Sequence, residues 1–142
     1  YSLTKGEIIR LVDLKGKKPN FVAITKSWGF IVCYASKIKT DAVKHYIYVF
    51  SINGELIKKK KINFQVYSWC SWNSAKDFDY MAISDEKGNL FAFEVFDCDK
   101  LCQIASCESK VVSLSYFRDI NCIIAITQAG NILFIPYHYS AS

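Results

Sequence analysis

The chain has 142 residues, is 51% hydrophobic and 15% aromatic, and carries a net charge of +5. This composition suits a packed globular domain and excludes a disordered one. The longest apolar run, residues 29–35, falls well short of the ~20 residues that a membrane-spanning helix needs.

Short apolar or alternating segments, separated by turn-forming residues, predict β-strands along the whole chain. In chain order, these strands are expected at residues 6–14, 21–25, 30–35, 46–51, 56–62, 66–71, 80–84, 90–96, 101–106, 111–116, 122–127 and 132–137. A longer polar loop is expected over residues 37–44, and Asn53-Gly54 predicts a type I′ hairpin turn. No segment has the period of an amphipathic helix, so the predicted class is all-β.

The sequence also repeats. Gly88-Asn89 and the strand after it recur 42 residues later at Gly130-Asn131, and Phe50 precedes Phe93 by 43 residues. Pairs of a small and a large residue recur at intervals of 45 residues: Ala23-Ile24, Ser68-Trp69 and Ser113-Leu114. Such a period, with about four short strands in each unit, is typical of β-propeller blades.

We therefore predict about three four-stranded blades, at residues 20–62, 63–106 and 107–142, with residues 6–14 as the outer strand of a preceding blade. Propellers close with about four to eight blades, so three blades indicate a partial propeller. The chain also begins at Tyr1 rather than Met. Both observations lead us to expect a segment of a larger polypeptide.

The order of strands and turns resembles WD40 repeats of a degenerate kind. No Trp-Asp dipeptide closes the aromatic strands, which end in Phe50-Ser51, Phe93-Glu94 and Ile135-Pro136. Three stretches are similar to the C-terminal propeller of BEACH-domain proteins: Ser27 to Val32, Tyr48 to Gly54 and Phe78 to Gly88. This resemblance implies a scaffold of membrane traffic whose propeller binds other proteins at vesicle or endosomal membranes.

Little in the sequence indicates catalysis. The two histidines, His45 in an expected loop and His138 near the end, stand beside no plausible nucleophile or acid. Gly88 and Gly130 are single turn glycines and not a phosphate-binding loop. Four carboxylates surround strand ends, where solvated turns are expected: Asp77, Asp79, Asp85 and Glu86. We expect no enzyme, no cofactor and no small-molecule substrate.

Six cysteines raise the question of a metal site. The spacing Cys98-x3-Cys102-x4-Cys107 lacks the second ligand pair that zinc usually requires, so packing thiols are favoured over zinc. The chain contains no Asn-x-Ser/Thr sequon. Reduced thiols are typical of the cytosol, so we expect a cytoplasmic protein, peripheral to vesicle or endosomal membranes under the BEACH resemblance.

Lysine clusters and two tryptophans form the predicted interaction surface. Loops between middle strands and between units share one rim of a propeller, which predicts a basic face. Trp28 and Trp72 are expected in turns, where each could anchor a partner or fold back over its own sheet. The full set is Lys15, Lys17, Lys18, Trp28, Lys37, Lys39, Lys44, Lys58, Lys59, Lys60, Lys61, Trp72 and Lys87.

These observations favour a non-enzymatic scaffold that binds proteins. The alternative is a membrane-contact module in which the lysine-rich loops and strand bind anionic lipid or phosphoinositide. A third interpretation is a stand-alone β domain of another family, and the plain interpretation of the lysines is a solvated surface. Nucleic acid is not an expected partner.

Overall fold

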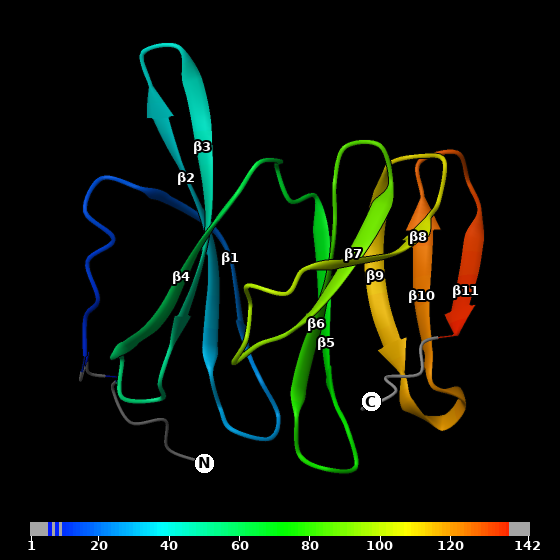
Figure 1. The fold of residues 1–142 in the computed structure, drawn as a ribbon, viewed down its shortest axis with the longest axis horizontal. Coiled ribbons are helices and arrows are strands. Elements are labelled where there is room, and N and C mark those ends of the chain that lie inside the picture. Colours follow the sequence, from blue (N-terminus) through cyan, green and yellow to red (C-terminus); the bar gives the residue numbers. More distant parts are fainter. Residues whose placement is uncertain (1–5, 7, 9, 137–142) are drawn as a thin grey trace.

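The structure, a computed structural model, describes residues 6, 8 and 10–136, which form three antiparallel β-sheets (Figure 1). The first sheet contains β1 (Lys18–Ile24), β2 (Ile31–Lys39), β3 (Ala42–Phe50) and β4 (Leu56–Ile62). The second contains β5 (Ser68–Asn73), β6 (Asp79–Ser84), β7 (Asn89–Glu94) and β8 (Cys102–Ser106). The third contains β9 (Val111–Phe117), β10 (Cys122–Thr127) and β11 (Ile132–Pro136), with the short 3-10 helix η1 (Arg118–Ile120) after β9. The predicted all-β class is confirmed.

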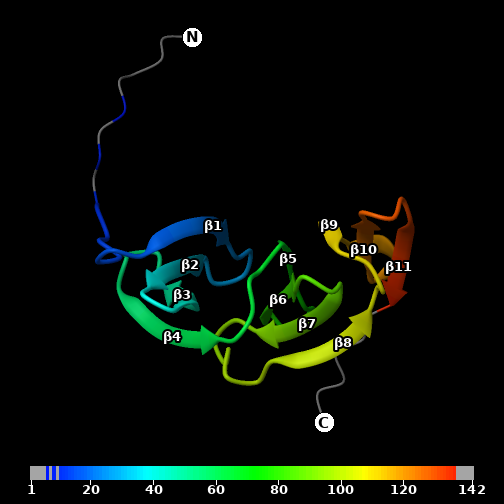
Figure 2. The same ribbon diagram turned by 90° about the horizontal axis from the view of Figure 1, so that it is seen from above.

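Each strand pairs with its neighbour in the chain, so every sheet is an up-and-down meander. The sheets stand side by side in a curved row, with β1, β5 and β9 along its concave side (Figure 2). The three sheets span residues 18–62, 68–106 and 111–136, and the predicted units were 20–62, 63–106 and 107–142. In the described residues the third sheet has three strands where four were expected, and residues 137–142 of that unit lie outside the described part.

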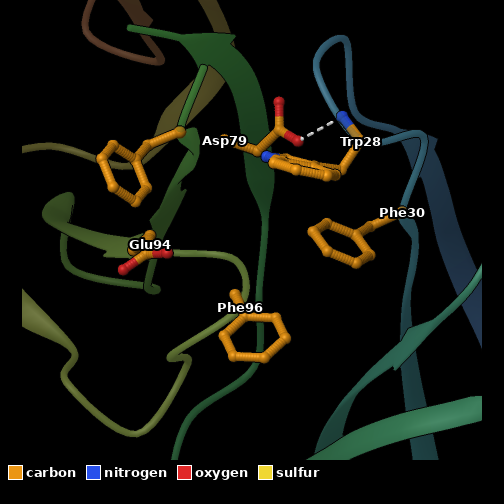
Figure 3. Close-up of a pocket in the computed structure, with 6 residues that line it drawn as sticks. Trp28, Phe30, Asp79, Glu94 and Phe96 are labelled. Atoms are coloured by element: carbon orange, nitrogen blue, oxygen red, sulfur yellow. Dashed lines mark hydrogen bonds between the residues drawn. The ribbon is translucent and has the colours of Figure 1, made fainter. Parts of the chain in front are cut away.

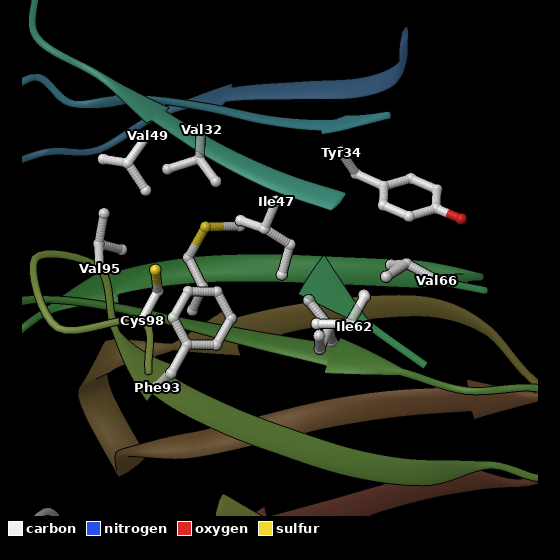
Figure 4. Packing of buried hydrophobic residues seen from close by; sticks show 11 residues of the cluster. Val32, Tyr34, Ile47, Val49, Ile62, Val66, Phe93, Val95 and Cys98 are labelled. Carbon is white, nitrogen blue, oxygen red and sulfur yellow. The ribbon is translucent and has the colours of Figure 1, made fainter. Parts of the chain in front are cut away.

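Apolar side chains fill the spaces between adjacent sheets. Strand β6 is buried along its whole length and supplies alternate side chains to both spaces, because successive residues of a strand point to opposite faces. The cluster between the first and second sheets contains Val32, Tyr34, Ile47, Val49, Ile62, Val66, Met81, Ile83, Phe93, Val95 and Cys98 (Figure 4). The cluster between the second and third contains Trp72, Tyr80, Ala82, Leu90, Ala92, Cys107, Val111, Leu114, Ile123 and Ala125.

Four hairpin turns share one hydrogen-bond pattern over five residues. In each, the first residue's N–H donates to the fifth residue's C=O, and the fourth residue's N–H donates to the first residue's C=O. The first residue's side chain also accepts the fifth residue's N–H, at 2.9 to 3.3 Å. The fourth residue has a positive φ, which favours glycine. These turns are Ser51–Glu55, Ser74–Phe78, Asp85–Asn89 and Thr127–Asn131.

The shared pattern corrects the type I′ turn predicted at Asn53-Gly54. A type I′ turn needs positive φ at both central residues, whereas Gly54 has φ 83° and Asn53 is not in the left-handed region. The repeated Gly88-Asn89 and Gly130-Asn131 dipeptides occupy equivalent positions in the β6–β7 and β10–β11 turns. Their likeness in sequence therefore reflects one turn geometry.

The polar loop predicted at residues 37–44 is wrong. Strands β2 and β3 stay paired as far as Lys39 and Ala42, which leaves Thr40 and Asp41 as the turn. Ile38 and Val43 face each other in this ladder and alternate with lysines, so the segment keeps the period of a strand. The hairpin stands out beyond the other turns of the same rim (Figure 1).

The strand predicted at residues 6–14 is also wrong for its described residues, which are 6, 8 and 10–14. A strand needs a neighbouring strand to pair with, and none of the described strands pairs with this segment. Instead, Leu14 packs against the outward face of the first sheet, on the buried side chains of Cys33, Tyr48 and Phe50.

Candidate functional site

The lysine run 58–61 divides between the two faces of β4. Lys58 and Lys60 face the second sheet: Lys58 Nζ lies 3.3 Å from Asp99 Oδ2 and 3.9 Å from Asp97 Oδ1, and Lys60 Nζ lies 3.8 Å from Asp99 Oδ1. Partly exposed pairs of this kind contribute under ~1 kcal/mol each. Half of the predicted basic strand is therefore already paired within the molecule.

Lys59 lies on the outward face of the first sheet, where it meets Lys17. The Lys59 ammonium is 4.7 Å from the ring centre of Tyr46 and 5.8 Å from that of Tyr48. The Lys17 ammonium is 5.2 Å from each of the same ring centres. These are cation–π distances, so two lysines from separate predicted groups cover one aromatic pair.

The protruding β2–β3 hairpin gathers four lysines. Lys37 lies opposite Lys44 in the ladder. Lys39, and to a lesser degree Lys61, lower the pKa of the Lys44 ammonium because like charges lie close together. We call Lys37, Lys39, Lys44 and Lys61 the basic hairpin cluster.

The remaining predicted lysines are Lys18, Lys15 and Lys87. Lys18 begins β1 opposite Ser36, one residue before Lys37 in β2. Lys15 precedes β1 in a turn and its N–H donates to Asp13 Oδ1 at 2.9 Å. Lys87 is exposed in the β6–β7 turn, on the rim that also holds the β2–β3 and β10–β11 turns (Figure 1). We call this the upper rim, and the opposite one, with the β1–β2, β5–β6 and β9–β10 turns, the lower rim.

The two predicted tryptophan anchors differ. Trp28 is 65% exposed in the β1–β2 turn, and its Nε1–H donates to the Asp77 carbonyl at 2.7 Å, so it reaches toward the second sheet rather than back over its own. Trp72 is not in a turn: it lies in β5, is 5% exposed, and stacks on Tyr116 with ring centres 4.9 Å apart. An exposed anchor at Trp72 is therefore wrong.

An aromatic pocket of about 220 Å³ opens at the lower rim between the first and second sheets. We call it the lower-rim pocket (Figure 3). Three of its aromatic side chains are exposed, at 65% for Trp28, 42% for Phe78 and 56% for Phe96. Its lining consists of Trp28, Phe30, Phe78, Asp79, Glu94 and Phe96.

Asp79 holds the side of the pocket that Trp28 forms. The residue is 2% exposed, and its two carboxylate oxygens accept the N–H groups of Ser27 at 2.9 Å and Trp28 at 3.0 Å. The solvated turn predicted for this aspartate is wrong, because the side chain is buried against the preceding sheet. Hydrogen bonds from N–H groups to a carboxylate are stronger than those between neutral groups, so Asp79 joins the two sheets firmly.

Glu94 lies at the pocket without a partner. It is half-buried at the end of β7, and within the described part of the chain its carboxylate makes no hydrogen bond or ion pair. Burial, and next the nearby charge of Asp97, raise the pKa of this carboxyl group above its usual range. Lys100 and Lys58 act weakly in the opposite direction.

A short polar chain links all three sheets along the lower rim. Asn73 Nδ2 donates to Ser27 Oγ at 3.0 Å, which joins the second sheet to the first. Arg118 Nη2 donates to the Asn73 carbonyl at 3.3 Å and to Asn73 Oδ1, which joins the third sheet to the second. These bonds hold the rim on which the pocket lies.

The six cysteines are free thiols. Cys98 is buried between the first and second sheets, Cys107 is buried between the second and third, and Cys102 is exposed, so the three cysteines of the spaced motif lie apart. Burial raises the pKa of the Cys70 thiol to about 12. Among the residues that the structure describes, no three His, Cys, Asp or Glu side chains are placed to hold a metal ion.

Of the two histidines, one lies in a described strand and the other outside the described residues. His45 lies in β3 rather than in a loop, and its Nδ1 is 2.6 Å from the Tyr34 hydroxyl. Burial lowers the pKa of its imidazole, which favours the neutral ring. His138 lies outside the described residues.

In the described part of the chain, no helix has the length and apolar character needed to cross a membrane. No protein-family model matches the chain, and no curated protein matches it.

Proposed function

We propose that the three sheets are blades of a WD40-like β-propeller, and that this propeller is a non-enzymatic scaffold for protein–protein interaction. Three features support the blades: the up-and-down order of strands, the curved row with the first strands on the concave side, and the apolar clusters between sheets. The resemblance to BEACH-domain proteins supports a role for the scaffold in membrane traffic, with partners at vesicle or endosomal surfaces.

The lower-rim pocket is the observation on which the interaction function rests. Interfaces concentrate their binding energy in a few large side chains, with tryptophan prominent among them. Trp28 is held by its backbone and indole N–H groups while its ring stays exposed, so little side-chain entropy is lost when a partner binds. An aromatic hollow built from two adjacent blades is a suitable anchor for a protein partner.

A photocrosslinking side chain at position 96, in the protein within its own cells, tests this function. We expect covalent adducts with partner protein, and we expect them to disappear when Phe78→Ser alters the pocket. The same group at Val112, which is 52% exposed on the third sheet, is the control. Equal adducts at both positions, or none at position 96, would contradict an interaction site at the pocket.

The basic hairpin cluster supports a second candidate, contact with an anionic membrane. Its four lysines lie together on the upper rim, and Ile38 and Val43, which are 82% and 49% exposed, form an apolar pair beside them. Lysines near an anionic surface contribute ~1 kcal/mol each, and an apolar pair can enter the headgroup region.

Vesicle co-sedimentation separates this candidate from the scaffold. Replacing Lys37, Lys39 and Lys44 by Ser should weaken binding to vesicles of phosphatidylserine and phosphatidylcholine on the order of 100-fold, which corresponds to ~3 kcal/mol. Replacing Lys26, Lys76 and Lys100, which are exposed elsewhere, removes the same charge and should have little effect. Vesicle binding that is equally strong in both triple variants and at high salt would exclude membrane contact through the hairpin.

A further inference from the structure

We propose that the lower-rim pocket binds the ammonium group of a lysine side chain on a partner protein, with methylated lysine preferred. This inference rests on the scaffold function proposed above and names the chemistry that the pocket recognises. Trp28, Phe30, Phe96 and Glu94 lie around a common space (Figure 3). Aromatic faces attract cations, tryptophan most strongly, and rings gathered round a hollow are the usual way to bind alkylated ammonium groups.

The charge of the pocket points to a cation. Glu94 is the one lining carboxylate with free acceptor oxygens among the described residues, since both oxygens of Asp79 already accept backbone N–H groups. The neighbouring cations do not neutralise Glu94. Lys58 pairs with Asp99 and Asp97, and Lys100 Nζ lies 3.5 Å from Asp97 Oδ2.

The number of acceptors favours methylated lysine over arginine. A guanidinium group has five N–H donors and an unmodified ammonium group has three, and each donor that enters an apolar pocket needs an acceptor. One carboxylate and several rings cannot satisfy a guanidinium group. Each methyl group removes a donor and adds apolar surface for the rings, so the preference should rise from arginine through lysine to trimethyl-lysine.

The walls are set before the ligand arrives. Trp28 is held from the second sheet through its own N–H and its indole N–H. The Phe30 N–H donates to Thr25 Oγ1 at 2.9 Å, and the rings of Phe30 and Phe96 lie 6.2 Å apart across the junction. Because these rings come from both sheets, the hollow keeps its shape as long as the sheets stay packed.

Choline and its uncharged carbon analogue, 3,3-dimethylbutan-1-ol, test the inference with probes of equal shape. Each is titrated into the protein while the indole N–H signal of Trp28 is followed by NMR. Choline should bind roughly tenfold more tightly than the alcohol. The Glu94→Gln substitution should weaken the binding of choline by a similar factor and leave the binding of the alcohol unchanged. The Phe96→Ala substitution should weaken the binding of both probes. A peptide with one trimethyl-lysine, beside its norleucine counterpart, extends the test to protein ligands.

The outcomes are distinct. Equal binding of choline and the alcohol would overturn cation recognition but leave an apolar anchor for proteins, so the scaffold function would survive. No binding of either probe, together with no adducts at position 96, would overturn both proposals. Binding to phosphatidylcholine vesicles that is lost in Glu94→Gln, with no binding of the trimethyl-lysine peptide, would assign the pocket to a lipid headgroup and overturn the protein partner.

Discussion

Asp79 decides how the first and second sheets meet, because its carboxylate is buried at the junction and accepts two N–H groups from the other sheet. Asp77 stands two residues earlier, in the β5–β6 turn, and contributes to this junction only its backbone carbonyl, which accepts the Trp28 indole N–H. The two aspartates therefore look alike in sequence and differ in what their side chains do.

This difference predicts unequal losses of stability for the same Asp→Asn substitution at the two positions. Asp79→Asn keeps an acceptor for one N–H but places an amide donor against the other, so it should lower the free energy of unfolding by about 2 kcal/mol. Asp77→Asn should change it by less than ~0.5 kcal/mol, since asparagine tolerates the φ of 62° at this position. Urea unfolding measures both. Similar losses in the two variants would contradict the role of the Asp79 carboxylate.

Glu94 gives a pH-dependent prediction. Its pKa is raised in the folded state, so the folded protein binds that proton more tightly than the unfolded chain does. The stability contributed by this group therefore falls as pH rises from the ordinary glutamate pKa through the raised value. Glu94→Gln should raise the melting temperature at neutral pH and leave it unchanged in acid. The groups near this carboxylate are Asp97, Lys100, Lys58 and, across the pocket, Asp79. A gain in acid alone would contradict the prediction.

At the scale of the elements, two equivalent turns offer a matched pair of glycines. Gly88 and Gly130 have φ of 88° and 91°, so an alanine at either site is strained by ~1–2 kcal/mol. A Cβ at Gly88 would also lie 2.0 Å from the Ser109 carbonyl oxygen, whereas a Cβ at Gly130 would meet no atom of the described residues within 4 Å. Gly88→Ala should therefore cost at least ~2 kcal/mol more than Gly130→Ala. Differential scanning calorimetry gives both values, and equal losses would contradict the close contact.

Most strands could be predicted from the sequence, because their apolar or alternating segments are short and separated by turn-forming residues. The β2–β3 hairpin was missed because its lysines resemble a solvated loop, although Ile38 and Val43 keep the period of a strand. Residues 10–14 failed for the opposite reason: they alternate, but no described strand pairs with them. The hydrophobic period of a segment shows only that it could form a strand. Whether it does depends on a neighbouring strand with which it can pair.

The candidate site was much less predictable. Trp28 stood out as a turn aromatic, but apart from Phe30 its neighbours in the pocket lie about 50 or more residues away and in another sheet. Asp79 looked like any carboxylate near a strand end, and nothing local indicated that Ser27 and Trp28 would cover it. Sites built where two sheets meet depend on packing, which a single sequence does not display.

At the scale of the whole molecule, the outward face of the third sheet leaves apolar side chains uncovered. Ile132 and Phe134 are each 62% exposed and Ile126 is 41% exposed. In a propeller the next blade would cover this face. The 142-residue chain by itself should therefore self-associate as its concentration rises, and the double change Ile132→Thr with Phe134→Thr should reduce this. Sedimentation velocity measures it, with Ile120→Thr as the control at an exposed residue off that face. Unchanged association in the double variant would contradict the prediction.

Two of the three tryptophans, Trp28 and Trp72, lie at different junctions between the sheets and can show the order in which those junctions open. Trp28 reports on the junction of the first two sheets, since its ring faces water while a carbonyl of the neighbouring sheet holds its indole N–H. Trp72 reports on the interior between the second and third sheets. Fluorescence changes at the two sites would coincide if the protein unfolds in one step. A fluorescence change at Trp28 that precedes the change at Trp72 would mean that the first and second sheets separate before either sheet unfolds.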